Sequence, residues 1–556
     1  MTNDIIVKQV ACSPFTDQKP GTAGLRKKVS VFSQPHYLET YVQAVFNALK
    51  LPEGSALVVG GDGRYYNNRA INTIIAIAAA NGVRKLIIGR NGLLSTPAAS
   101  NLIRRHRADG GFVLTASHNP GGPDGDFGIK YNIANGGQAP ESLTDAFFAE
   151  SKKLTAYRIA EINDVDLSNT GLQHIGQLQV EVVDSVSDYS TLLQSLFDFD
   201  CMRDAISGGL RMQFDAMHGI TGPYAEDIFC KLLGLPSEMI NRATPLPDFG
   251  GCHPDPNPVD APDLISAAMS EQSPALLAAS DGDGDRNMIV LPGQMVSPCD
   301  SLAILLANAH LIPGYSNGMP GVARSMPTSK AADRVAEKLG VPCYETPTGW
   351  RFFCNLLDSG DIGLCGEESF GTGSSHVREK DGMWAILFWL NLLATTGKSG
   401  NEILREHWQE FGRDYYQRYD YFIEDADQAA VLFADLKSRI ETSPLTLAGN
   451  ANSDFEIAHF EISKADSFTY HDPVDGSVSE NQGLRIEFSN SSRIVYRLSG
   501  TGTAGATLRV YLQHYEPRES HQQLDPTAVL TPLGNLASHI GEIGSRTGLS
   551  KPTAVI

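Results

Sequence analysis

Short apolar runs along the chain alternate with glycine-rich loops and with segments of helical pattern. ALVVGG at 56–61, KLIIG at 85–89 and GFVL at 111–114 are continuous apolar runs, and each leads into a polar loop. INTIIAIAAANG at 71–82 is typical of a helix that ends before Gly82. Continuous apolar runs of this length are consistent with buried strands. The pattern predicts α/β units with largely parallel sheets.

The same strand-to-loop step recurs through the middle of the chain. It is found in GLRMQFDAMHG from Gly209 and in ALLAASDGDGDRNMIVL from Ala275, where a second strand follows the loop directly. AADRVAEKLG at 331–340 and GWRFFCNLL at 349–357 predict helices, and DIGLCGEESFG at 361–371 predicts a strand with a polar tip. Ligands of α/β sheets gather at the carboxyl ends of strands. Nearly every conspicuous polar loop here follows such an end.

From about residue 403 the pattern changes. DYYQRYDYFIE, HFEISKADSFTYHDP and LRIEFSNSSRIVYRLSG are typical of antiparallel strands, and a few helical segments accompany them. This predicts a separate C-terminal α+β domain. A chain of 556 residues is too long for one core, and typical domain sizes favour three or four domains.

Composition narrows the class of protein. The apolar fraction of 42% and the charged fraction of 19% are those of a soluble globular protein. The net charge of −20 argues against a general nucleic-acid or membrane binder, but leaves room for a small anionic substrate. The N-terminus lacks the pattern of a signal peptide. The most apolar stretch, MWAILFWLNLLA from Met383, is shorter than the roughly 20 residues of a membrane span, so a core helix is expected.

The cysteines predict a reducing, cytoplasmic location. The eight cysteines contain no CxxC pair, and in a chain of this size they are most simply free thiols. Cys252, His253 and Asp255 do not match a standard zinc spacing, so ordinary loop contacts are expected for them.

DGDGDR at 281–286 is the strongest metal-binding pattern. Asp281, Asp283 and Asp285 alternate with glycines, which remove bulk and permit positive φ, so the three carboxylates can converge on one cation. Oxygen ligands favour Mg²⁺, Ca²⁺ or Mn²⁺ over zinc. An EF-hand is excluded because its sixth position is Arg286 and its twelfth is Pro292. An acidic surface turn is the alternative.

Three further loops carry candidate chemistry. TASHNPGG at 115–122 places Ser117 beside His118 without the GxSxG pattern of a hydrolase, so phosphoryl transfer is an option and a capped Asn-Pro turn is the alternative. RLSGTGTAGATLR at 497–509 can form a backbone nest for a phosphate, or a turn between strands. GEESFGTGSSHVREKDG at 366–382 suits a sugar site, or a solvated loop. KPGTAGLRKK at 19–28 and TPTGW at 346–350 are weaker signals.

TASHNPGG, DGDGDR, GEESFG and RLSGTG, in this order, resemble the α-D-phosphohexomutases. The resemblance runs from Lys19 to Arg509 and implies three similar mixed α/β domains plus a C-terminal α+β domain around a central active-site cleft. We expect domain I with the phosphoserine loop, domain II with the metal-binding loop, domain III with the sugar-binding loop and domain IV with the phosphate-binding loop. The expected ranges are 1–187, 188–300, 301–402 and 403–556.

The resemblance also implies roles for matching residues. Ser117 would be the phosphoserine, and it would share one Mg²⁺ with Asp281, Asp283 and Asp285. The further catalytic candidates are His118, Lys130, Arg286 and Lys380, of which His118 and Lys130 are candidates for proton transfer. The substrate-binding candidates are Thr22, Arg26, Thr348, Gly349, Glu367, Ser369, Arg497, Ser499, Gly500, Thr501, Gly502 and Thr503. Ala504 departs from the serine frequent in relatives, although backbone donors would survive that change.

The implied reaction interconverts glucose 1-phosphate and glucose 6-phosphate through glucose 1,6-bisphosphate. Phe370 favours this branch, because mutases for mannose or glucosamine phosphates usually carry glycine after the serine of GEESFG. A related phosphohexomutase, a non-catalytic phosphoprotein and a phosphatase are the alternatives. We expect a small sugar phosphate as the partner, no nucleic acid, no membrane, and a monomer or dimer.

Overall fold

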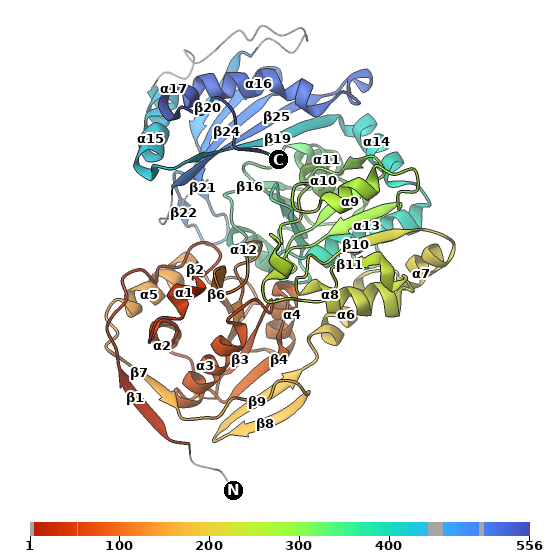
Figure 1. Cartoon of the computed structure of the whole chain (residues 1–556). Helices are drawn as coiled ribbons and strands as arrows, with labels where there is room; N and C mark the ends of the chain where they lie inside the picture. Colours follow the sequence, from red (N-terminus) through yellow and green to blue (C-terminus); the bar gives the residue numbers. More distant parts are fainter. Residues whose placement is uncertain (1–4, 53, 443–459, 500–504) are drawn as a thin grey trace. The chain divides into compact units, whose positions relative to one another are not determined.

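The computed structural model describes residues 5–52, 54–442, 460–499 and 505–556 (Figure 1). The chain divides into two compact units. The first unit comprises residues 1–298, 308–320 and 349–400, and the second comprises 299–307, 321–348 and 401–556. None of the helices in these described ranges is both long and apolar enough to cross a membrane.

A seven-stranded sheet forms the N-terminal part of the first unit (Figure 1). Its strand order is β2 (Leu25–Lys28), β6 (Asp126–Ile133), β5 (Gly110–Leu114), β3 (Ala56–Gly61), β4 (Lys85–Leu93), β9 (Leu178–Val183) and β8 (Gly171–Ile175). The central strands from β5 to β9 are parallel, whereas β6, β2 and β8 join antiparallel. The associated helices are α1 (Val29–Phe32), α2 (Tyr37–Leu49), α3 (Asn67–Ala80), α4 (Thr96–His106) and α5 (Glu141–Ser151). β1 (Val7–Ala11) and β7 (Ala156–Ala160) form a separate antiparallel ribbon.

The predicted apolar runs are the buried strands of this sheet. β3 and β5 are almost entirely buried, and the apolar face of α3 packs in the same core. α3 begins at Asn67, four residues before the predicted helix, because Tyr66 turns the chain into it with a left-handed φ of +81°. Because β3 and β5 are parallel, their following loops, 62–66 and 115–125, leave the same edge of the sheet.

A second, five-stranded sheet follows in the first unit. Its order is β11 (Ile240–Asn241), β10 (Met212–Asp215), β12 (Leu276–Ala279), β13 (Met288–Leu291) and β14 (Gln294–Met295). β12 and β13 are antiparallel, as the direct strand–loop–strand pattern of the sequence predicts, and the loop between them is DGDGDR. The nearby helices are α6 (Ser185–Leu196), α7 (Phe199–Ser207), α8 (Thr221–Ala225), the π-helical turn Glu226–Leu232 and α9 (Pro262–Ala268).

The following elements are divided between the two units. β17 (Leu364–Glu367) and β18 (Gly371–Ser374) form an antiparallel hairpin in the first unit, with α12 (Arg351–Ser359) and α13 (Gly382–Thr396). α13 carries the most apolar stretch of the chain and is a buried core helix, as predicted. β15 (Val322–Ser325) and β16 (Cys343–Thr346) pair in parallel in the second unit, with α11 (Ala331–Leu339), and α10 (Pro298–Asn308) precedes them.

The C-terminal part of the second unit is an antiparallel sheet with helices, which confirms the predicted α+β character. The strand order is β20 (Ile462–Ser467), β23 (Leu484–Phe488), β24 (Arg493–Ser499), β25 (Ala506–Glu516), β19 (Arg413–Ile423) and β26 (Ala554–Val555). α15 (Ala426–Thr442) and α16 (Pro526–Ile540) pack their apolar side chains against this sheet (Figure 1). The remaining elements are α14 (Gly400–Phe411), α17 (Ile543–Thr547) and the short pair β21 (Tyr470–His471) and β22 (Val478–Ser479).

Candidate active site

The loop after β5 holds Ser117 in a left-handed backbone conformation, with φ of +53°. The Ser117 N–H donates to Thr115 Oγ1 (2.7 Å), and that hydroxyl donates to Asp62 Oδ2 (2.7 Å). Arg64 donates from Nη2 to the Ser117 carbonyl oxygen (2.7 Å). A left-handed conformation costs a non-glycine residue about 1 kcal/mol, and these bonds offset that cost. The loop therefore fixes the Ser117 hydroxyl in one position.

The DGDGDR loop after β12 brings three buried carboxylates together. Asp281, Asp283 and Asp285 each have a carboxylate oxygen within 4.8 Å of the others. Asp281 Oδ1 accepts from the backbone N–H groups of Asp285 (3.0 Å) and Arg286 (3.1 Å). Burial, with the charges of Asp283 and Asp285, raises the pKa of Asp281 well above its ordinary value. A bound cation would relieve this repulsion.

The loop that carries Ser117 and the DGDGDR loop meet at the Ser117 hydroxyl. Ser117 Oγ donates to Asp281 Oδ2 (2.8 Å), and Ser117 is 2% exposed. A Cβ on Gly282 would lie 2.8 Å from the Ser117 carbonyl oxygen, so the two backbones approach closely enough to require glycine. Gly284 has φ of +80°, which is the second use predicted for the glycines of this motif. The sequence prediction that these loops act together is consistent with this geometry.

Several buried polar atoms of this site have no hydrogen-bond partner among the described residues. They include the acceptors Asp283 Oδ1 and Asp285 Oδ1 and the donors Arg26 Nε and Arg286 Nε. Buried polar groups in folded proteins are nearly always satisfied. The two carboxylate oxygens are suited to a hard cation, and the two guanidinium N–H groups to an anion.

Two lysines predicted for the site are paired with buried carboxylates. Lys380 Nζ lies 3.3 Å from Asp285 Oδ2; burial alone would lower the pKa of Lys380, but Asp285 and the other carboxylates of the site raise it. Lys130 Nζ donates to Glu379 Oε1 (2.9 Å), and Glu379 is fully buried. Both lysine Nζ atoms therefore lie close to carboxylate oxygens of the site.

His118 is half-buried beside Ser117. Its Nδ1 lies 3.5 Å from Ser117 Oγ, and its ring meets the His253 ring edge-on at 5.8 Å between centroids. Burial, and then the charges of Arg286 and Arg26, lowers the pKa of His118 well below its ordinary value. The imidazole is therefore uncharged near neutral pH and available as a proton acceptor.

The predicted sugar loop places Glu367 at the end of β17. Gly349 N–H donates to Glu367 Oε1 (2.9 Å). Burial raises the pKa of Glu367, Lys380 opposes that rise, and Glu368 adds to it. Ser369 is half-buried in the turn that leads into β18. Glu367, Ser369, Gly349 and Lys380 all belong to the first unit.

The other predicted substrate residues belong to other segments of the chain, and some lie outside the described ranges. Thr22 is exposed in the turn before β2. Thr348 belongs to the second unit, where Arg497 donates from Nη1 to the Tyr511 hydroxyl (3.2 Å) and Ser499 ends β24. The predicted residues Gly500, Thr501, Gly502 and Thr503, with Ala504, lie outside the described residues.

The structure adds residues that the sequence analysis did not select. Asp62, Arg64 and Thr115 hold the Ser117 backbone, and Glu379 holds Lys130. A signal for the first two was present, because GGDGR at 60–64 is also a polar loop at the carboxyl end of a buried strand. Glu379 lies within the polar loop of 366–382, but its partner is 249 residues away in the sequence.

Residues 253–260 contain a second group of possible ion ligands, which contacts Arg286. His253 Nδ1 pairs with Asp260 Oδ2 (2.9 Å) and Asp255 pairs with Arg286 (3.1 Å), in agreement with the loop contacts predicted for this segment. His253, Asp255 and Asp260 also lie close enough to one another to ligate an ion.

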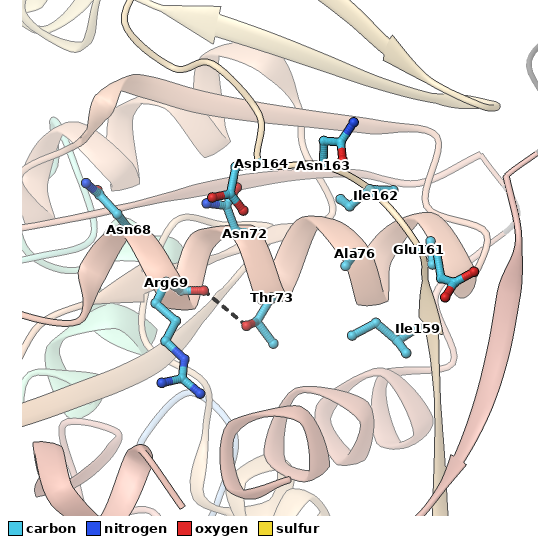
Figure 2. A pocket seen from close by; sticks show the side chains of 11 residues that line it. Asn68, Arg69, Asn72, Thr73, Ala76, Ile159, Glu161, Ile162, Asn163 and Asp164 are labelled. Carbon is cyan, nitrogen blue, oxygen red and sulfur yellow. Dashed lines mark hydrogen bonds between the residues drawn. The ribbon is translucent and has the colours of Figure 1, made fainter. Parts of the chain in front are cut away.

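A hollow of about 750 Å³ lies between α3 and the segment 159–164 (Figure 2). Thr73 Oγ1 donates there to the Arg69 carbonyl oxygen (3.0 Å). No residue predicted for catalysis lines this hollow.

Family models match nearly the whole chain. Models described as phosphoglucomutase/phosphomannomutase α/β/α domains I, II and III match residues 17–158, 187–294 and 298–411. A model described as the C-terminal domain of phosphoglucomutase-1 matches residues 413–553.

Curated and solved relatives agree with these models. A phosphoglucomutase of Rhizobium radiobacter is 54% identical, covering 99% of this chain and 100% of its own. Phosphoglucomutase-1 of Oryctolagus cuniculus is 48% identical, covering 98% and 99%. The open-form crystal structure of the exocytosis-sensitive phosphoprotein pp63/parafusin, a phosphoglucomutase from Paramecium, is 44% identical with a TM-score of 0.90 and covers 99% of both chains.

Proposed function

The chain belongs to the phosphoglucomutase/phosphomannomutase family of isomerases, with its three α/β domains and C-terminal domain, and we propose that it interconverts glucose 1-phosphate and glucose 6-phosphate. The full-length relatives named phosphoglucomutase support the reaction. The residue roles below, and the domain boundaries expected from the sequence, are part of the proposal.

The observation that carries the proposal is the hydroxyl of Ser117 at 2.8 Å from Asp281 in the metal loop. Ser117 lacks the GxSxG elbow of acyl-transfer enzymes, and its hydroxyl donates to a carboxylate of the DGDGDR loop. It is well placed to carry a phosphoryl group whose charge a cation neutralises. Ser117 is therefore the phosphoryl carrier.

Mg²⁺ fits the donor set of this site. Asp281, Asp283 and Asp285 supply oxygen ligands, two of whose atoms have no hydrogen-bond partner in the part of the chain that the structure describes, and an oxygen of phosphorylated Ser117 would join them. Bound there, Mg²⁺ would neutralise charge on the transferring phosphoryl group. The guanidinium of Arg286 and the ammonium of Lys380 add positive charge beside the same loop.

In the transfer step, the P–O bond to Ser117 Oγ breaks while a P–O bond forms to the free hydroxyl of the sugar phosphate. The proton of that hydroxyl passes to a base, and His118 is the better candidate because its ring is uncharged, whereas Lys130 Nζ is already bonded to Glu379. Ser117 takes a phosphoryl group back from the resulting glucose 1,6-bisphosphate, and the same proton returns.

The remaining predicted residues bind the sugar and its second phosphate. Glu367 and Ser369 would accept sugar hydroxyls, with Thr348 and Gly349 in the same sugar loop. Thr22 and Arg26 would contact the substrate from the first domain. The non-reacting phosphate would bind Arg497, Ser499, Gly500, Thr501, Gly502 and Thr503. Two phosphate sites are required because glucose 1,6-bisphosphate must turn end for end between the two transfers.

Phe370 supports the preference for glucose phosphates. It follows Ser369 in the sugar loop and holds a left-handed φ of +67°, a conformation in which glycine is easily accommodated. A phenylalanine in that conformation is strained, so the surrounding loop must hold it in place. We also propose a cytoplasmic location, which the free state of all eight cysteines supports.

The proposed function is tested by a coupled assay for glucose 6-phosphate formed from glucose 1-phosphate, with Mg²⁺ and trace glucose 1,6-bisphosphate. Wild-type protein should turn over, and Ser117→Ala should not. Parallel kinetics on mannose and glucosamine phosphates measure the preference. Higher kcat/KM on either of these sugars would reassign the chain to that branch, and net phosphate release without isomerisation would make it a phosphatase.

A further inference from the structure

Asp381 directly follows Lys380 and begins α13, and its buried carboxylate accepts three hydrogen bonds. The Tyr189 hydroxyl (2.5 Å) and the Trp384 backbone N–H (3.0 Å) donate to Oδ1. His376 Nε2 donates to Oδ2 (2.8 Å). Capping a helix requires only one such bond. The additional donors come from α6 and from the segment after β18, so Asp381 ties three elements together beside Lys380.

A chain of hydrogen bonds sets the orientation of the His376 ring. The Trp384 indole N–H can only donate, and it donates to the Tyr315 hydroxyl (2.7 Å). Tyr315 then donates to Ser374 Oγ (2.6 Å), and Ser374 donates to His376 Nδ1 (2.7 Å). With the Tyr315–Ser374 bond reversed, the Tyr315 proton would have no acceptor among the described residues. His376 therefore carries its proton on Nε2, the atom that faces Asp381.

Close backbone contacts connect this network to the metal loop. The Gly382 N–H donates to the Gly284 carbonyl oxygen (3.1 Å). A Cβ on Gly382 would lie 2.1 Å from the Arg286 carbonyl oxygen, and one on Gly371 would lie 2.4 Å from Lys380 Cδ. The Lys380 side chain thus crosses a gap kept open by glycine and reaches Asp285. Its position depends on where the backbone at 380–382 is held.

Glu379, on the other side of Lys380, is anchored as firmly. Its Oε1 accepts from Lys130 (2.9 Å) and Asn132 (2.8 Å), and its Oε2 accepts from Gln138 (3.0 Å). Of the three side chains at 379–381, it is Lys380 that reaches the metal loop. The carboxylates of its two chain neighbours, Glu379 and Asp381, are held by hydrogen bonds. The donors to Asp381 differ from those to Glu379, because Tyr189 and His376 are not themselves among the residues assigned to the reaction, whereas Lys130 is.

We propose that Tyr189 and His376 are positioning residues of the phosphoryl-transfer reaction, which act through Asp381 on the placement of the Lys380 ammonium. The inference rests on the proposed function. In water-poor sites a displacement of about 1 Å in a charged group can cost about 100-fold in rate, so positions this far from the substrate can control turnover. Neither residue touches the reacting atoms.

The test uses variants that remove one donor and keep the ring. Tyr189→Phe and His376→Phe should each lower kcat/KM about tenfold or more, as expected for the loss of a hydrogen bond to a charged group. His376→Gln, which can again donate an N–H to Asp381, should recover part of the loss. Tyr157→Phe is the matched control, because it removes a buried hydroxyl bonded to His36 Nδ1 (2.9 Å) away from the site. It should leave kcat/KM within about twofold of wild type.

A double-mutant cycle separates positioning from general stability. In a Lys380→Arg background, where the ammonium is already replaced, Tyr189→Phe should cost much less than in wild type. Full additivity with Lys380→Arg, or equal activity of Tyr189→Phe and Tyr157→Phe, would overturn the inference. Wild-type protein without mutase activity would instead overturn the proposed function. Active wild type with normal Tyr189→Phe and His376→Phe would reject the positioning role alone.

Discussion

Ser117 Oγ lies 2.8 Å from Asp281 Oδ2, although 164 residues separate the two in the chain. The contact joins the end of a parallel strand of the first sheet to the end of a strand of the second. Glycine at 282 is what allows the backbones to come so close. The hydroxyl and the metal loop therefore form one site, and each should fail without the other.

Replacing Asp281 with asparagine removes one charge from the metal loop at nearly constant volume. We expect Asp281→Asn to lower kcat by two orders of magnitude or more, because cation stabilisation of a transferring phosphoryl group contributes several kcal/mol. Mg²⁺ should raise the Tm of wild type but not of the variant. Asp525→Asn, at the start of α16 in the second unit, is the control. An Mg²⁺-dependent Tm retained in Asp281→Asn would contradict the ligand assignment.

The Thr115 hydroxyl supports the strained backbone of Ser117 by acting both as an acceptor and as a donor. Thr115→Val keeps the shape but removes the acceptor of the Ser117 N–H and the donor to Asp62. Leaving these buried groups unsatisfied should lower the free energy of unfolding by about 1–3 kcal/mol. The phosphoryl-transfer rate should fall as well, because the serine loses its fixed orientation. Urea unfolding measures the effect on stability, and single-turnover kinetics measure the effect on rate. A loss of stability without a loss of rate would show that the Ser117 hydroxyl keeps its orientation without Thr115.

Gly382 marks the closest approach of the Lys380 segment to the metal loop. Gly382→Ala would place a Cβ 2.1 Å from the Arg286 carbonyl oxygen, so one of the two backbones must move. We expect a fall in kcat/KM of at least tenfold, since small displacements are costly in such sites. Gly544→Ala, in α17, meets its nearest atom at 3.7 Å and should be neutral or slightly stabilising. Equal kcat/KM values for the two variants would argue against this contact.

His407 in α14 should make stability depend on pH. Burial, with Arg334 nearby, lowers the pKa of His407 from 6.5 to about 3. As pH falls below 6.5 the unfolded chain takes up the proton first, so this contribution is complete above that value and is lost progressively toward pH 3. At pH 5 the loss is about 2 kcal/mol. His407→Phe should reduce the change in unfolding free energy between pH 7 and pH 5, whereas the exposed control His471→Gln should not. If the unfolding free energies of wild type and His407→Phe change equally with pH, His407 is not the source of this dependence.

The features that could be predicted from the sequence are those that a short segment of the chain determines. Asp281, Asp283 and Asp285 are spaced to converge within one loop, and Ser117 and Glu367 follow apolar runs that are indeed buried strands. The change in the pattern of apolar and polar residues near residue 403 likewise predicted the antiparallel C-terminal sheet, because period-two patterns reflect local strand geometry. These features depend on neighbours in the chain.

Contacts between distant segments could not be read in the same way. Tyr189 meets Asp381 across 192 residues, and Lys130 meets Glu379 across 249. Nothing in the sequence around Tyr189, a half-apolar helix, distinguishes its hydroxyl from others. The start of α3 was also missed, because it depends on the left-handed turn at Tyr66 rather than on the apolar pattern.

Phosphorylation of Ser117 is tested most directly by intact-mass spectrometry with peptide mapping after incubation with glucose 1,6-bisphosphate and Mg²⁺, followed by addition of glucose 1-phosphate. We expect one phosphate per chain, located on Ser117, which is lost to the sugar in a single turnover and is absent from Ser117→Ala. A chain that isomerises glucose 1-phosphate with its phosphate on another residue, or a Ser117→Ala variant that keeps most of its activity, would contradict the account.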